Sequence, residues 1–174
     1  MQIRFEHPSD IDAIRSLTYQ AFDGHPHHAA GAKPSEHLLI DRLRSAGVLS
    51  LSLVAEQAET IVGHIAFSPI TMTTSSGQSI TDWYGLAPVS VLPEQQNKGI
   101  GAALIKEGLA RLAGLQAQGV VVLGEPHYYH HFGFSSDPKL HLAGVPPQYF
   151  MYHLLADTQP LPQGEVHYHP AFFE

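Results

Sequence analysis

The stretch VLPEQQNKGIGAALIKEGL, residues 91–109, has a Gln-x-x-Gly-x-Gly spacing at the point where a strand-like run gives way to a helix-like one. Gln96 is followed there by Gly99 and Gly101. The first amides of a helix have no intrahelical partner, and glycine lets a ligand approach them closely. Two interpretations follow from these residues alone. The turn can hold a pyrophosphate, or Asn97 can cap the helix while the glycines only permit a tight turn.

The composition of the turn suits an anion, but two common phosphate-binding patterns do not fit it. Lys98 and the helix dipole supply positive charge, and the amides of residues 97–102 are candidate donors. The dinucleotide fingerprint lacks its third glycine, because residue 104 is leucine, and too little chain follows Glu125 for further βαβ repeats. The P-loop pattern fails because no Gly-Lys-Ser/Thr follows the glycines.

The residues around the turn predict a strand, a helix and a second strand. Residues 82–93, DWYGLAPVSVLP, form the first strand, in which Pro88 indicates an edge, an irregularity or a bulge. A helix over about 99–115 has apolar residues on more than one side, so it packs on a sheet. The β-branched run GVVVLGE, residues 119–125, is typical of a buried parallel strand after a crossover helix.

The other elements are predicted from apolar periodicity and from turn signals. Gly133 ends a short helical turn, and the polar EQAET separates the two strands of a hairpin. We expect a strand at 3–7, helices at 8–24 and 35–47 with an exposed loop at 25–34 between them, an antiparallel hairpin within 51–80, a helical turn at 126–133, and final strands at 149–157 and 165–170.

Length and composition bound the class of protein. The 174 residues, 44% hydrophobic and 14% charged, predict one globular domain over residues 1–174. The formal net charge of −7 argues against a nucleic-acid partner, and the lack of cysteine excludes disulfides and a cysteine nucleophile. No apolar run approaches the ~20 residues that span a bilayer, and no signal peptide is visible. We therefore expect a cytoplasmic location and no membrane partner.

Two histidine clusters raise the question of a metal site, because imidazole is a common metal ligand. No cysteine and no flanking acidic cluster completes either site, so we expect solvated or packed histidines and no bound metal. The clusters are His25, His27 and His28, and His127, His130 and His131.

The chain resembles the GNAT superfamily of acetyl-CoA-dependent N-acetyltransferases. Residues 89–104, VSVLPEQQNKGIGAAL, match its central motif, Gln/Arg-x-x-Gly-x-Gly/Ala after a strand that ends in a Val-x-Pro-like segment. A second landmark is Tyr129, which stands four residues before the Gly133–Phe134 pair. The stretch LGEPHYYHHFGF, residues 123–134, is similar to a bacterial group of small, largely uncharacterised acetyltransferases with a Gly-Glu-Pro-x-Tyr-Tyr element.

The resemblance implies a fold and a co-substrate. The fold is α/β of the α+β type, with a mixed, mostly antiparallel central sheet, a splayed parallel strand pair and helices on both faces. The co-substrate is acetyl-CoA, with its pyrophosphate on the glycine-rich turn and its pantetheine arm along the preceding strand. The implied coenzyme-binding residues are Val89, Ser90, Val91, Gln96, Asn97, Lys98, Gly99, Ile100, Gly101 and Ala102.

The resemblance also implies a transferase reaction, in which an amine attacks the thioester directly and no acyl-enzyme forms. The acceptor is a primary amine of a small molecule or a protein. Backbone amides near Val91 are then placed to stabilise the oxyanion, and Tyr129 is the candidate acid for the departing thiolate. The alternative for Tyr129 is a packed aromatic at the edge of the core.

The general base is the point at which this sequence departs from the family pattern. Many relatives carry a glutamate on a central strand, and residues 83–91 contain none. Glu125 matches the position of a base in some relatives, but it can equally cap the turn that follows. A non-catalytic acyl-CoA sensor or interaction module is therefore the alternative function. The acceptor stays open, as does a homodimer formed through the tail at 165–174.

Overall fold

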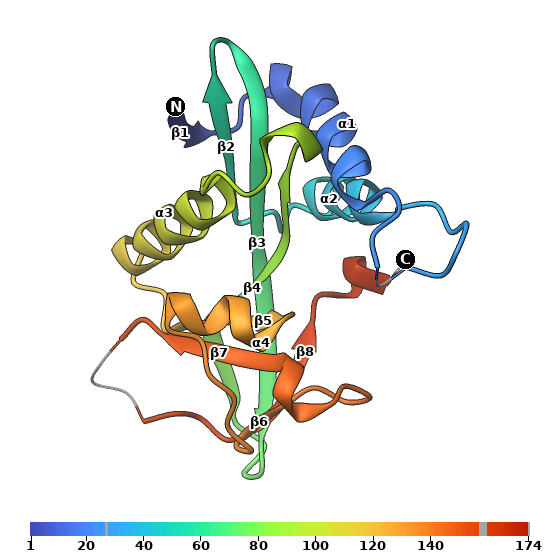
Figure 1. The fold of residues 1–174 in the computed structure, drawn as a ribbon. Coiled ribbons are helices and arrows are strands. Elements are labelled where there is room, and N and C mark those ends of the chain that lie inside the picture. The colour runs from blue at the N-terminus through green and yellow to red at the C-terminus, as the bar shows by residue number, and fades with distance from the viewer. Residues whose placement is uncertain (27, 157–159, 174) are drawn as a thin grey trace. The chain divides into compact units, whose positions relative to one another are not determined.

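A computed structural model of the chain describes residues 1–26, 28–156 and 160–173 (Figure 1). His27, in the predicted loop, and Asp157, at the end of a predicted strand, lie outside the described residues. The chain forms two compact units. The first comprises Met1–Phe67, Pro88–Gly108 and Ala171–Glu174, and the second comprises Ser68–Ala87 and Leu109–Pro170. The prediction of one domain over residues 1–174 stays a prediction.

The order of helices and strands agrees with the order predicted from the sequence. The α-helices are α1 (Ile11–Phe22), α2 (Glu36–Ser45), α3 (Ile100–Gly114) and α4 (Pro126–Tyr129). The strands are β1 (Gln2–Phe5), β2 (Leu51–Gln57), β3 (Thr60–Thr74), β4 (Ser79–Val91), β5 (Gly119–Leu123), β6 (Leu140–His141), β7 (Phe150–Leu154) and β8 (Gly164–Tyr168). Short 3-10 helices are η1 (Pro8–Asp10), η2 (Pro93–Gln95), η3 (His130–Phe132), η4 (Pro147–Tyr149) and η5 (Pro170–Phe173). Strand β6 and most of these short helices were not predicted.

In the first unit, helices cover both faces of a sheet in which β1 pairs with β2 and β2 with β3, both antiparallel. Ile14 of α1 and Ile40 of α2 form a buried cluster with Val54 of β2. Gly63 of β3 pairs with the residue that follows Val54 on β2. Because successive strand residues face opposite sides of a sheet, Gly63 faces the side away from Val54. There a Cβ on Gly63 would lie 2.9 Å from Ile100 Cγ2 of α3. Figure 1 shows α3 on the side of β3 away from α1 and α2.

In the second unit, β4 pairs with β5 in parallel, β5 with β7 antiparallel, β3 with β8 antiparallel and β6 with β8 in parallel. The predicted mixed, mostly antiparallel sheet is confirmed, and the β6–β8 pair is a second parallel contact that was not predicted. Among the described residues, the β4–β5 ladder ends at Gly85 and Val121, although β5 continues to Leu123. Strand β4 itself continues to Val91. Its pairing with β5 therefore ends before Pro88, the residue that the sequence predicted to be irregular.

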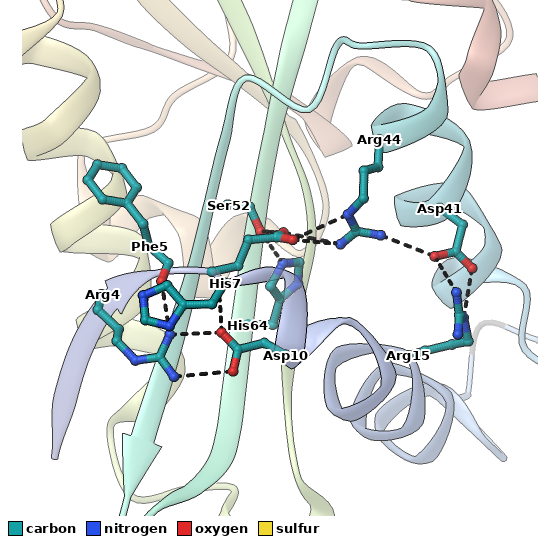
Figure 2. A network of polar contacts seen from close by, with 10 residues as sticks. Arg4, Phe5, His7, Asp10, Arg15, Asp41, Arg44, Ser52 and His64 are labelled. Carbon is teal, nitrogen blue, oxygen red and sulfur yellow. Dashed lines mark hydrogen bonds and ion pairs between the residues drawn. The ribbon is translucent and has the colours of Figure 1, made fainter.

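His64 of β3 is a fully buried polar residue in the first unit (Figure 2). Its Nε2 lies 2.8 Å from Ser52 Oγ of β2. Burial and, to a lesser extent, the charge of Arg44 lower the pKa of His64 from 6.5 to about 3. The imidazole is therefore neutral at neutral pH.

We expect the free energy of unfolding to decrease as pH falls below about 6.5. His64 titrates at 6.5 when unfolded and at about 3 when folded, so the unfolded chain binds more protons between these values. The stabilisation is complete above pH 6.5 and is lost towards pH 3, at no more than about 1.4 kcal/mol per pH unit. Urea denaturation between pH 7 and 4 measures the slope. His64→Gln should flatten it, and an unchanged slope would contradict the assignment.

Candidate functional site

The glycine-rich turn between β4 and α3 lies within the first unit and has an unusual backbone conformation. Asn97 and Gly99 adopt left-handed φ angles of 63° and 86°. Asparagine and glycine tolerate this region better than other residues, which explains their choice here. A Cβ added to Gly99 would meet nothing within 4 Å. The turn is therefore shaped by its backbone and is open on the side of Gly99.

The amides of this turn are free to bind an external acceptor. Within the described chain, no group accepts a hydrogen bond from the backbone N–H groups of residues 97–102. The next amide, Ala103 N, donates to Gly99 O at 3.0 Å. Lys98 is exposed, with its Nζ 3.4 Å from Gln95 Oε1. Unpaired amides at a helix N-terminus beside a lysine favour phosphate oxygens, which supports the cradle over a plain helix start.

Over the residues that the structure describes, the strand that leads into the turn has one edge without a pairing strand. Leu92 N donates to Val62 O of β3 at 2.9 Å. Because successive residues of a strand direct their polar groups to opposite sides, the N–H groups of Val91 and Val89 point away from β3. On that side Gln96 Nε2 donates to Val91 O at 3.0 Å and ties the turn to the strand. This edge can donate two hydrogen bonds to an extended ligand.

Tyr129 lies in the second unit, at the end of α4, with 9% of its surface exposed. Its ring contacts Tyr128 edge-on at 5.1 Å and Phe134 at 5.8 Å between centroids. A Cβ on Gly124 would lie 2.5 Å from Tyr129 Cε2, so the ring packs directly on that glycine. Burial raises the pKa of Tyr129, and the neighbouring Tyr128 raises it further. The phenol stays protonated at neutral pH, and its hydroxyl has no hydrogen-bond partner among the residues described.

Glu125 occupies the N-cap position of α4, but its side chain makes no capping hydrogen bond. Its carbonyl oxygen instead accepts hydrogen bonds from Tyr128 N at 3.2 Å and Tyr129 N at 3.1 Å. The side chain is exposed. The capping interpretation is therefore wrong for the carboxylate, while a role as general base stays a prediction.

Gly124→Ala should destabilise the protein by about 1–3 kcal/mol, because the new methyl group overlaps the buried Tyr129 ring. Urea denaturation measures the loss. Gly114→Ala is the matched control, since a Cβ there meets nothing within 4 Å and the residue lies in the same unit. Equal effects of the two substitutions would contradict the packing of Tyr129 on Gly124.

The structure groups the predicted site residues in two places. Val89–Val91 and Gln96–Ala102 form one continuous strand and turn in the first unit, and Glu125 and Tyr129 lie close together in the second. The sequence did not single out Gly124 as the surface for Tyr129. The family-like Gly-Glu-Pro element was the available signal. The need for glycine at its first position is explained only once the position of the Tyr129 ring is known.

The histidine clusters contain packed and paired rings. His28 Nε2 lies 2.6 Å from Glu36 Oε1, and the rings of His127 and His131 meet edge-on at 5.6 Å. Over the residues that the structure describes, no group of three or more His, Asp or Glu side chains could hold a metal ion. His27 lies outside those residues, so the absence of a metal stays a prediction. None of the helices in the described residues has both the length and the apolar composition of a membrane-spanning helix.

Comparisons with known proteins identify relatives of this chain. A family model for the acetyltransferase (GNAT) domain matches residues 49–136. The uncharacterized N-acetyltransferase YjhQ of Escherichia coli K12 is 37% identical over 86 residues, which are 49% of this chain and 46% of YjhQ. The match thus spans about half the length of that curated relative.

Two solved structures are similar over nearly the whole chain. One is a GNAT family acetyltransferase from Brucella melitensis in complex with acetyl-CoA, with 43% identity and a TM-score of 0.80 over 98% of this chain and 97% of that one. The other is the E. coli GNAT family N-acetyltransferase YhbS in complex with CoA, with 31% identity and a TM-score of 0.85 over 99% and 92%. With the motif, the fold and these similarities in agreement, the chain belongs to the GNAT acetyltransferase family.

Proposed function

We propose that this protein transfers an acetyl group from acetyl-CoA directly to a primary amine. The observation that carries the proposal is the row of unpaired amides at residues 97–102, held open by the left-handed Asn97 and Gly99. The 43% identical Brucella relative was solved in complex with acetyl-CoA, which supports the same co-substrate here.

The turn and the strand before it have separate roles in binding. The amides of residues 97–102 bind the pyrophosphate, and Lys98 adds a positive charge beside it. Val89 and Val91 direct their N–H groups away from β3, where they bind the pantetheine arm. Val91 N–H also stabilises the oxyanion that forms when the thioester carbonyl is attacked. Gln96 keeps the turn in place through its bond to Val91 O.

The transfer needs no acyl-enzyme, in keeping with a chain that contains no cysteine. The amine nitrogen attacks the thioester carbonyl, the C–S bond breaks, and the thiolate receives a proton while the amine loses one. Tyr129 is the proposed proton donor, because it holds the family's tyrosine position before Gly133 and its phenol is protonated at neutral pH. A role for Glu125 as the acceptor of the amine proton stays a prediction from the family resemblance. The acceptor amine, a homodimer and a cytoplasmic location stay predictions.

A turnover assay tests the proposal. The protein is incubated with acetyl-CoA and polyamines, amino acids, aminoglycosides or peptides with a free amine, and free CoA thiol and acetylated product are measured. Release of CoA that depends on an amine supports the transferase. Saturable binding of acetyl-CoA without product from any amine would favour the non-catalytic sensor or interaction module instead.

A further inference from the structure

A continuous chain of polar contacts runs from the surface to the buried face of the sheet in the first unit (Figure 2). Glu6, just after β1, accepts a hydrogen bond from Arg44 Nη2 at 3.0 Å and another from the Ser52 hydroxyl. Ser52 Oγ also contacts His64 Nε2. Glu6 and Ser52 line a cavity of about 450 Å³, which exposed Phe5 also borders. The chain of contacts therefore begins beside solvent and ends inside the protein.

The hydrogen bonds determine which nitrogen of His64 carries the proton. An ionised carboxylate only accepts, so the Ser52 hydroxyl donates its single proton to Glu6. His64 Nε2 must then donate to Ser52 Oγ, which leaves Nδ1 as the acceptor nitrogen of a neutral imidazole. Nδ1 is buried, and no described side chain contacts it with a hydrogen bond. A buried acceptor without a hydrogen bond is unfavourable, which argues for a further partner.

Ser90 lies across from His64 on the neighbouring strand. The bond from Leu92 N to Val62 O sets these residues opposite each other, and two residues further along each antiparallel strand Ser90 lies opposite His64. Both side chains therefore share one face of the sheet. Ser90 Oγ is also buried and has no hydrogen-bond partner within the described chain. One water bridging Ser90 Oγ and His64 Nδ1 would satisfy both atoms.

We propose that His64, Ser52 and Glu6 form a proton relay that carries the amine proton from Ser90 to the cavity beside Glu6. The relay rests on the proposed function, because Ser90 lies between Val89 and Val91 on the strand assigned to the pantetheine arm. It supplies the proton acceptor that strand residues 83–91 lack, since they contain no carboxylate. The three residues act through Ser90 and do not touch the substrate.

The proton transfers balance at each step. The amine proton passes through Ser90 and the bridging water to His64 Nδ1, while the proton on Nε2 moves to Ser52 Oγ. The Ser52 hydroxyl gives its own proton to the Glu6 carboxylate, which releases it to solvent in the cavity. Arg44 stays bound to Glu6 and holds the carboxylate in position.

Steady-state kinetics of Glu6→Gln and Ser52→Ala test the relay. We expect kcat to fall at least about 10-fold, with the KM for acetyl-CoA within about 2-fold of wild type, because only proton removal is affected. The solvent deuterium isotope effect on kcat should also differ between the two variants and the wild type. Asp10→Asn is the matched control, since it removes a carboxylate that pairs with Arg4 at 2.8 Å, outside the relay. Its kcat should stay near wild type at a temperature at which all the variants are folded.

The outcomes separate the relay from the proposed function. Wild-type turnover with unchanged kcat in Glu6→Gln and Ser52→Ala overturns the relay and leaves the acetyltransferase intact. No turnover by the wild type with any amine overturns both. Nitrogen-15 NMR of wild-type His64 gives a test that needs no variant to fold. A neutral ring protonated at Nε2 supports the relay, and protonation at Nδ1 overturns it.

Discussion

Gly99→Glu should lower the affinity for acetyl-CoA by at least about 100-fold, which corresponds to about 2.7 kcal/mol of binding free energy. Among the described residues, no group accepts a hydrogen bond from the amides around Gly99, and the space beside its Cα is open. A glutamate there fills that space and brings a negative charge to the proposed phosphate position. Isothermal titration calorimetry with acetyl-CoA and with CoA measures the change. Gly101→Glu should act in the same direction.

The control for this substitution must carry the same backbone cost. Gly144 has a φ of 79°, and a Cβ there also meets nothing within 4 Å. Gly144→Glu therefore introduces the same side chain into the same left-handed conformation at a position in the second unit. Its affinity for acetyl-CoA should match wild type. Unchanged affinity in Gly99→Glu would overturn the assignment of the turn as the pyrophosphate cradle.

The glycine-rich turn could be predicted from sequence because its determinants are local. The spacing from Gln96 to Gly101 lies within six consecutive residues, at a strand-to-helix boundary that apolar patterns reveal. The left-handed conformation of Asn97 was not predicted, but asparagine is one of the few residues suited to it. Most of the proposed coenzyme site could therefore be predicted from residues that are neighbours in the sequence.

The features that the sequence did not predict are contacts between residues far apart in the chain and elements of very few residues. Glu6 follows β1, Ser52 lies on β2 and His64 on β3, and nothing in the spacing between them indicates that they meet. Strand β6 has only two residues, too few to show any periodicity, so its parallel contact with β8 could not be predicted. Each depends on tertiary packing, which a pattern along one chain does not encode.

Tyr129→Phe should lower kcat by about 100-fold while the affinity for acetyl-CoA stays within about 2-fold of wild type. A positioned general acid contributes about 10²–10⁴ to a rate, and the phenol of Tyr129 is protonated at neutral pH. The substitution is clean because the hydroxyl has no hydrogen-bond partner among the described residues, so none is left unpaired. The phenylalanine ring still packs on Gly124, and the free energy of unfolding should change by less than about 0.5 kcal/mol.

Tyr128→Phe separates the role of the acid from the role of the aromatic cluster. Tyr128 contacts Tyr129 edge-on, yet it is 41% exposed and lies outside the family-like spacing to Gly133. Both variants remove one phenolic oxygen from the same helical turn, so a structural effect of that loss should appear in both. A fall in kcat confined to Tyr129→Phe assigns the proton transfer to Tyr129. If the two variants retain the wild-type rate, Tyr129 is a packing residue, and the thiolate receives its proton from another group.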